Sequence, residues 1–113
     1  MQAESRLVGG VTILQLTGRF DAYAAPKIDE WLQARGSSEP TQLVVNMIGV
    51  NFLDSTALAT LVRGLKRCRE SGGGLHLCNM QQPVRIIFEL THLDKAFDIF
   101  GTEEDAVEAF KQD

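Results

Sequence analysis

The sequence predicts an α/β fold whose strands and helices follow the order ββαβαβαβα. Short β-branched and leucine-rich runs alternate with longer segments whose apolar residues have helical spacing, and glycine or proline separates them. This alternation favours a mixed sheet of four to five strands with substantial parallel character, covered by about four helices. The 113 residues, 44% of them hydrophobic, suit a single domain over 1–113 with a modest core.

A β-hairpin is predicted at the start of the chain. Residues 11–17 (VTILQLT) form a β-branched, mostly alternating run that is typical of a strand. A preceding strand over about 3–8 is predicted to pair with it through a turn at Gly9 and Gly10. The strand pattern breaks at 18–21.

A helix and a buried strand follow the hairpin. Pro26 suits the first turn of a helix, where its missing N–H is not needed, and Gly36 is predicted to end that helix. Residues 42–48 (QLVVNMI) are predicted to form a buried strand. We expect 49–54 to be an irregular link to the next helix.

The next helix is predicted to begin near Ser55 and to end at Ser71 and the glycines at 72–74. One apolar face is predicted from residues at i, i+3, i+4, i+7 and i+10. These residues are Leu58, Leu61, Val62, Leu65 and Cys68.

The C-terminal third continues the alternation. A core strand is predicted around 75–78, a helix opening at Pro83, a strand over 96–100 and a last helix capped by Thr102. The core candidates of these two helices are Val84, Ile87, Phe88, Leu90, Val107 and Phe110.

The charge and hydropathy of the chain limit its function. The net charge of −4 and the pI near 5.1 argue against broad binding to nucleic acid, which needs an excess of basic residues. The basic run of Arg63, Lys66, Arg67 and Arg69 is interpreted as the solvated face of a helix. No apolar run approaches the roughly 20 residues that span a bilayer, and no signal peptide is visible, so we expect a cytoplasmic protein.

Motifs for catalysis or metal binding are missing from the sequence. Cys68 and Cys78 lack the spacing of a metal site and are interpreted as small buried residues, and His76 and His92 as structural residues. The glycines at 72–74 lack the lysine and hydroxyl of a phosphate-binding loop. We therefore expect no cofactor, no metal and no enzymatic activity. A metal held by two acidic residues from distant loops is only a weak alternative.

The candidate functional site is the helix start at Asp54, Ser55 and Thr56. Ser and Asp are preferred helix caps, so these residues alone favour a structural cap. The same position tolerates a phosphate, because a helix N-terminus offers unpaired N–H groups and the positive end of a dipole. If the sheet brings Asp21 close, a phosphate there would add about −1.5 to −2 charges to an acidic surface and weaken a docked partner.

Small residues mark a second feature of the same helix. Ala57, Thr60 and Gly64 lie on one face and would allow a partner backbone to approach closely. The alternative is that they pack inside the domain. Gly64 in mid-helix costs about 1 kcal/mol relative to Ala, so we expect a packing or contact reason for it.

The chain resembles the STAS family, named for sulfate transporters and anti-sigma-factor antagonists. The resemblance is carried by LTGRFDAYAAPKIDEWL, by LVVNMIGVNFLDSTALATLVRGLKRCRESGGGLHL and by ELTHLDKAFDIFGTEEDAVEAF, which occur in the family's order. It implies a STAS-like single domain. It also implies an anti-sigma factor antagonist, whose unphosphorylated form binds an anti-sigma factor that is a serine kinase and so frees a sigma factor.

The resemblance also implies roles for individual residues. Ser55 matches the phosphorylated residue of the antagonists, with Thr56 as a secondary candidate, and Asp21 matches the acidic residue of the first loop. The kinase supplies the ATP, and a separate phosphatase resets the switch. The partner-binding residues are then expected to be Asp21, Asp54, Ser55, Thr56, Ala57, Thr60 and Gly64.

The chain departs from many antagonists at three positions. Ala57 and Ala59 stand where many have Gly, and Arg19 stands where many have an acidic residue. An alternative is therefore an accessory or scaffold subunit of another STAS assembly, such as a transporter component. A monomer is expected for the free chain, with edge strands and the exposed face of the second helix as the places where it would self-associate.

Overall fold

Five strands form one sheet in the order in which they occur along the chain, β1-β2-β3-β4-β5. The computed structural model describes residues 1–36 and 40–111 and confirms the predicted mixed α/β architecture. The strands and helices are β1 (Gln2–Val8), β2 (Val11–Phe20), α1 (Ala25–Gly36), β3 (Gln42–Leu53), α2 (Ser55–Glu70), β4 (Gly74–Cys78), α3 (Gln82–Leu90), β5 (Asp98–Phe100) and α4 (Glu103–Glu108). Short 3-10 turns cover Leu93–Lys95 and Ala109–Lys111.

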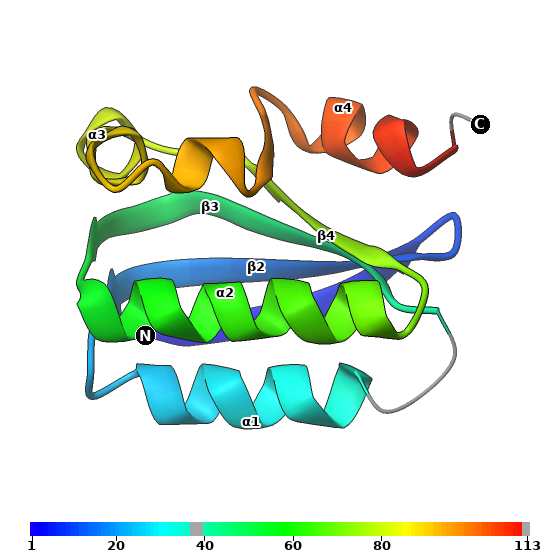
Figure 1. The fold of residues 1–113 in the computed structure, drawn as a ribbon, viewed down its shortest axis with the longest axis horizontal. Helices are drawn as coiled ribbons and strands as arrows, with labels where there is room; N and C mark the ends of the chain where they lie inside the picture. Colours follow the sequence, from blue (N-terminus) through cyan, green and yellow to red (C-terminus); the bar gives the residue numbers. More distant parts are fainter. Residues whose placement is uncertain (37–39, 112–113) are drawn as a thin grey trace.

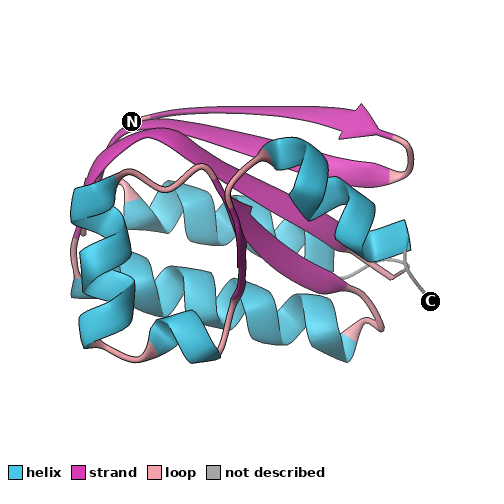
Figure 2. Cartoon of the chain, turned by 90° about the horizontal axis from the view of Figure 1, so that it is seen from above, coloured by secondary structure: helices cyan, strands magenta, loops and turns pink. Residues whose placement is uncertain are grey.

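The sheet separates two layers of helices. β1 is antiparallel to β2, and the other neighbours are parallel. Helices α1 and α2 lie side by side on one face, and α4 covers the other (Figure 1). The β1–β2 hairpin forms one edge of the sheet (Figure 2), and the three-residue β5 forms the other.

The hairpin turn confirms the prediction at Gly9 and Gly10. Both have positive φ, 54° and 84°, the left-handed conformations that a two-residue hairpin turn of type I′ needs. Val8 pairs with Val11 across the turn, and the register then runs without a bulge to Gln2.

Two strands extend further than predicted. The predicted break at 18–21 and the predicted irregular link at 49–54 are wrong, because β2 runs to Phe20 and β3 to Leu53. The register shifts once between Gln15 and Thr17 and again after Gly18, so bulges absorb the irregularity without ending the strands. At Gly49 a Cβ would lie 2.9 Å from the Thr17 hydroxyl, which explains why only glycine fits this crossing.

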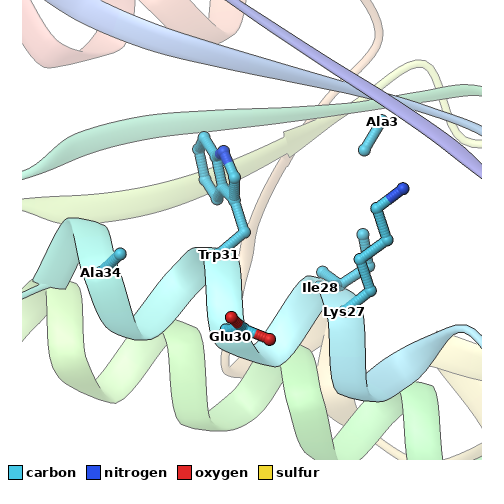
Figure 3. A pocket seen from close by; sticks show the side chains of 6 residues that line it. All are labelled: Ala3, Lys27, Ile28, Glu30, Trp31 and Ala34. Atoms are coloured by element: carbon cyan, nitrogen blue, oxygen red, sulfur yellow. The ribbon is translucent and has the colours of Figure 1, made fainter.

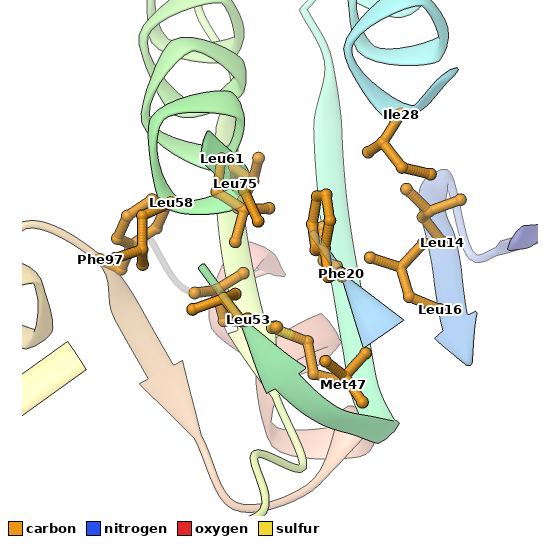
Figure 4. Packing of buried hydrophobic residues seen from close by; sticks show 14 of the residues in the cluster. Leu14, Leu16, Phe20, Ile28, Met47, Leu53, Leu58, Leu61, Leu75 and Phe97 are labelled. Carbon is orange, nitrogen blue, oxygen red and sulfur yellow. The ribbon is translucent and has the colours of Figure 1, made fainter. Parts of the chain in front are cut away.

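The main core lies between the sheet and helices α1 and α2 (Figure 4). Four of the five residues predicted for the apolar face of α2 are buried, but Val62 is 39% exposed, so its prediction is wrong. Leu90, at the end of α3, is also not a core residue, since it is 76% exposed. The buried faces of α2 and α3 are therefore narrower than the spacing of their apolar residues predicts.

The C-terminal segment packs on the opposite face. Strand β5 begins at Asp98 rather than at residue 96, and the Thr102 side chain caps α4 as predicted by accepting from the Asp105 N–H at 3.1 Å. The His76 ring stacks on Phe110 at 3.7 Å and bonds the Ala106 carbonyl at 2.9 Å, which is a structural role.

Both cysteines are buried free thiols, as the sequence predicted. Burial raises the pKa of Cys68 to about 11 and the pKa of Cys78 to about 12. The thiolate, which is the reactive form, is therefore scarce at neutral pH.

Candidate functional site

The candidate site lies where β2 and β3 end together. Phe20 and Leu53 are paired across the two strands, and each is followed by an aspartate, Asp21 and Asp54. The Asp54 N–H donates to the Phe20 carbonyl at 3.2 Å. The sheet therefore brings together the two loops that carry the predicted acidic residues, which was the condition set by the sequence.

Asp54 joins these two loops through both of its carboxylate oxygens. Oδ1 accepts from the Ala57 N–H at 3.0 Å and caps α2, while Oδ2 accepts from the Ala22 N–H at 2.9 Å. A carboxylate that caps a helix also complements the positive end of the helix dipole. The capping role that the sequence allowed to either Asp54 or Ser55 therefore belongs to Asp54.

Ser55 and Thr56 are the first two residues of α2, and both are exposed. Among the described residues, no hydrogen bond uses the Ser55 hydroxyl, while the Thr56 carbonyl accepts from the Thr60 hydroxyl at 3.0 Å. Since α2 has no acidic residue in its first turn, its N-terminal end is capped but carries no further negative charge. A group added to the Ser55 oxygen would enter solvent beside this end.

Asp21 shapes the loop between β2 and α1. Its Oδ1 accepts from the N–H groups of Tyr23 and Ala24 at 3.1 and 3.0 Å. Arg19 lies 3.9 Å from Asp21 Oδ2, and its guanidinium sits 3.9 Å from the centre of the Phe52 ring. The departure noted at Arg19 thus places a cation directly against the acidic residue, which makes this side of the site less negative.

The small residues of α2 lie behind the site, against α1. Ala57 and Thr60 are completely buried, and a Cβ on Gly64 would lie 2.9 Å from Leu32 Cδ1. The close approach that these residues permit is therefore made by α1 of the same chain. This packing supplies the reason for Gly64 that the sequence demanded, and it leaves Ala59 and Val62 on the outer face.

A shallow hollow of about 200 Å³ lies between the starts of α1 and α2. Thr56, Thr60 and Arg63 line it from α2, and Asp29 lines it from α1. Sequence reasoning missed one neighbour of the site, Tyr23, which is 96% exposed in the loop that Asp54 holds. An aromatic residue in a short loop before Pro26 is a signal that would have identified it.

Other kinds of site have no support in the described part of the chain. Over residues 1–36 and 40–111, no group of three or more His, Cys, Asp or Glu side chains gathers in a way that would hold a metal ion. None of the described helices is long and apolar enough to cross a membrane.

Comparison with known proteins places these features in a family context. The family model for the STAS domain matches residues 2–106. The chain is 31% identical to the anti-sigma-B factor antagonist of Listeria monocytogenes over 88 aligned residues. The aligned region covers 78% of this chain and 77% of that protein.

Solved structures share the fold. An anti-sigma factor antagonist from Mycobacterium paratuberculosis matches with a TM-score of 0.87 and 26% identity, covering 98% of this chain and 94% of that one. The phosphorylated form of SpoIIAA, a Bacillus cell fate determinant, matches with a TM-score of 0.73 and 19% identity, covering 96% of this chain and 98% of that one.

Proposed function

The chain belongs to the STAS domain family, and we propose that within it the chain is an anti-sigma factor antagonist switched off by phosphorylation of Ser55. The contrast between two adjacent residues carries the proposal. Both oxygens of the Asp54 carboxylate are hydrogen-bonded, whereas the Ser55 hydroxyl is exposed and, within the described residues, has no partner. A side chain that the fold does not use is open to modification.

In this proposal the unphosphorylated chain acts in the cytoplasm by binding an anti-sigma factor that is also a serine kinase, which frees a sigma factor. The kinase transfers phosphate from its own ATP to Ser55, the modified chain dissociates, and a phosphatase restores it. The chain itself supplies a binding surface and no catalytic group. Support comes from the curated relative, which is an anti-sigma-B factor antagonist, and from the shared fold of SpoIIAA, for which a phosphorylated form is known.

The physical basis of the switch is local charge. Phosphorylation adds about −1.5 to −2 charges at neutral pH. The first turn of α2 accepts this charge, because the N–H groups there favour an anion. The carboxylates of Asp54 and Asp21 lie in the same two joined loops, so phosphorylation makes this surface more acidic even though Arg19 lies against Asp21. A partner that docks on the unmodified surface then meets both repulsion and the cost of desolvating a phosphate.

The proposed docking surface lies at the ends of β2 and β3. The half-buried Asp21 and the exposed Ser55 and Thr56 form its centre, and Tyr23 supplies an exposed aromatic ring at its border. Asp54 acts from behind by holding the two loops together. The buried small residues of α2 contribute indirectly, because they set how closely α1 and α2 lie.

Paired variants test the proposal. Ser55→Ala is expected to keep partner binding and to block modification, whereas Ser55→Asp is expected to weaken binding at least about tenfold, the equivalent of roughly 1.4 kcal/mol. Both variants serve as baits in a pull-down from the native cell. The captured kinase is then incubated with the wild-type chain and ATP, and the modified residue is mapped by mass spectrometry.

A matched control tests whether the loss of partner binding depends on the position of the added charge and not on the charge alone. Gln82 is the exposed first residue of α3, so Gln82→Glu adds one negative charge at the start of a different helix. This control is expected to bind like wild type. Phosphate mapped only to other residues would contradict the site assignment. Partners that are captured equally by Ser55→Ala and Ser55→Asp would instead favour the accessory or scaffold role.

A further inference from the structure

We propose that two copies of this chain pair through β1, antiparallel and centred on Ser5, so that the two sheets become one. The two edges of the sheet differ in a way that points to β1. β5 has three residues, which is short enough to blunt an edge, whereas β1 has seven residues without proline or bulge. A long, regular edge strand is a template for another strand.

The hairpin fixes which backbone groups of β1 are free. Residues that flank a two-residue turn form a hydrogen-bonded pair, so Val8 bonds Val11. Hydrogen-bonded and non-bonded pairs then alternate along an antiparallel ladder. The N–H and C=O groups of Ala3, Ser5 and Leu7 therefore point away from β2, toward the open edge. Pairing with a second copy must use these three residues.

Charge selects the register of that pairing. Centring on Glu4 or on Arg6 would place that residue opposite its own copy, and like charges directly opposite are destabilising. Centring on Ser5 places Glu4 opposite Arg6 of the second copy, twice over by symmetry. Arg6 also bonds Glu103 of its own chain, so in the pair its guanidinium would lie between two carboxylates. This register also forms hydrogen-bonded pairs from all three residues whose backbone groups are free. Ser5 lies opposite Ser5 of the second copy, and Ala3 lies opposite Leu7 of the second copy. Only this register satisfies both the charges and the free backbone groups.

The side chains on the face of the sheet that α1 covers fit the same register. A hollow of about 330 Å³ forms a groove between β1 and α1 (Figure 3). A second hollow, of about 510 Å³, shares Lys27, Ile28 and Glu30 with this groove. Ala3 lines the groove of Figure 3 from β1, and the half-buried Trp31 lines it from α1. Residues directly opposite in a sheet point to the same face. Leu7 of the second copy, which is 72% exposed in one copy, would therefore enter the groove beside Ala3.

The proposed pairing leaves the switch accessible. Ser55 follows β3, and β2 separates β3 from the pairing edge. A paired molecule would thus present two independent Ser55 sites. This inference does not rest on the proposed function, and it differs from the monomer expected from the sequence.

A charge exchange tests the register. We expect sedimentation velocity to show a monomer–dimer equilibrium for the wild-type chain and a dissociation constant raised about tenfold or more in Glu4→Lys, since two opposite-charge pairs become like-charge pairs. Arg6→Glu alone is expected to weaken pairing as well. Because it also replaces the Arg6–Glu103 ion pair of the same chain with two like charges, its fold is verified by circular dichroism before the variants are mixed. In an equal mixture of the two variants, position 4 of each variant again faces an opposite charge at position 6 of the other, so association is expected to return. Glu89→Lys, which makes the same change on the exposed surface of α3, serves as the control.

Cross-linking gives a second, independent readout. At the centre of the pairing, the two Cα atoms of residue 5 are expected about 5.5 Å apart, within disulfide reach. Ser5→Cys should therefore form a covalent dimer under mild oxidation. Leu7→Cys should not, because four residues of strand, roughly 14 Å, separate residue 7 from its own copy. Circular dichroism is used to check that each variant is folded.

Three results would overturn the proposal. The first is a wild-type chain that stays monomeric at a concentration of about 1 mM. The second is a mixture of Glu4→Lys and Arg6→Glu that associates no better than either variant alone. The third is Leu7→Cys cross-linking as readily as Ser5→Cys.

Discussion

Helices α2 and α4 have the same kind of N-terminal cap but differ in the charge of their first turns. α2 is capped by Asp54 and α4 by Thr102, each accepting from the N–H three residues further on. The first turn of α4 contains Glu103, Glu104 and Asp105, whereas that of α2 contains no acidic residue. Acidic groups complement the positive end of a helix dipole. The chain therefore supplies its own acids at α4 and leaves the start of α2 without them.

The bonding of the two helix starts shows the same difference. Glu103 accepts hydrogen bonds from Arg6 and from Asn46, the latter at 3.0 Å, and so links α4 to β1 and β3. At α2 the linking role belongs to Asp54, and the exposed Ser55 beside it has no such role in the described structure. The start of α4 therefore uses its acidic residues in contacts within the fold, while the start of α2 combines a structural residue with an adjacent one that makes no described hydrogen bond.

The largest expected effect comes from removing the Asp54 carboxylate. Asp54→Ala is expected to lower the free energy of unfolding by about 2–4 kcal/mol, because it removes a helix cap and a charged acceptor for the Ala22 N–H. Urea denaturation measures this loss. Thr102→Ala removes a cap only and is expected to cost about 0.5–2 kcal/mol. Equal losses in the two variants would contradict the double role of Asp54.

A smaller effect is expected at Glu103. Burial by itself raises the pKa of this carboxyl, but the hydrogen bonds from Arg6 and Asn46 outweigh it, and the pKa lies below its usual value. A lowered pKa in the folded state stabilises the fold at pH values above the unfolded pKa of about 4.3, and this contribution is lost as the pH falls through the folded pKa.

Glu103→Gln is therefore expected to cost about 1 kcal/mol at neutral pH and to cost less as the solution is acidified. Thermal unfolding across the acid range gives the comparison. Glu104→Gln is the matched control, since it changes the next residue of the same turn, which is exposed. If the midpoints of thermal unfolding of Glu103→Gln and of wild type changed in parallel at every pH, the Arg6 contact would not stabilise the fold.

The smallest effect on stability is expected at Ser55. Ser55→Ala should change the free energy of unfolding by less than about 0.5 kcal/mol, because its exposed hydroxyl makes no described hydrogen bond. Urea denaturation beside Asp54→Ala makes the contrast direct. A loss above about 1 kcal/mol would mean that Ser55 shares the capping role, and the separation of structural and free residues would then fail.

The sequence was sufficient for the order of the strands and helices. Turn residues, a proline in the first turn and the Asp54–Ser55 pair act locally, so their signals survive without tertiary information. The family resemblance correctly indicated the STAS domain. The sequence left open whether the sheet brings the loops of Asp21 and Asp54 together, and the pairing of Phe20 with Leu53 shows that it does.

Tertiary contacts decided the features that were predicted wrongly. Gly18 and Gly49 are strand breakers by pattern, yet here they accommodate bulges that carry β2 and β3 on to the site. Ala57 and Gly64 suit an external or an internal neighbour equally, and only the position of α1 shows which one they contact. Val62 fits the apolar spacing, but the buried stripe of α2 is too narrow to include it.

The proposed function depends on Ser55 acting as a switch. The most direct test is the affinity, by titration calorimetry, of the kinase captured with the Ser55→Ala bait for the unmodified chain and for the chain phosphorylated at Ser55. We predict that phosphorylation weakens binding at least about tenfold, while the midpoint of thermal unfolding stays within about 4 °C because the fold does not use this hydroxyl. Equal affinities of the two forms for the kinase would contradict the account.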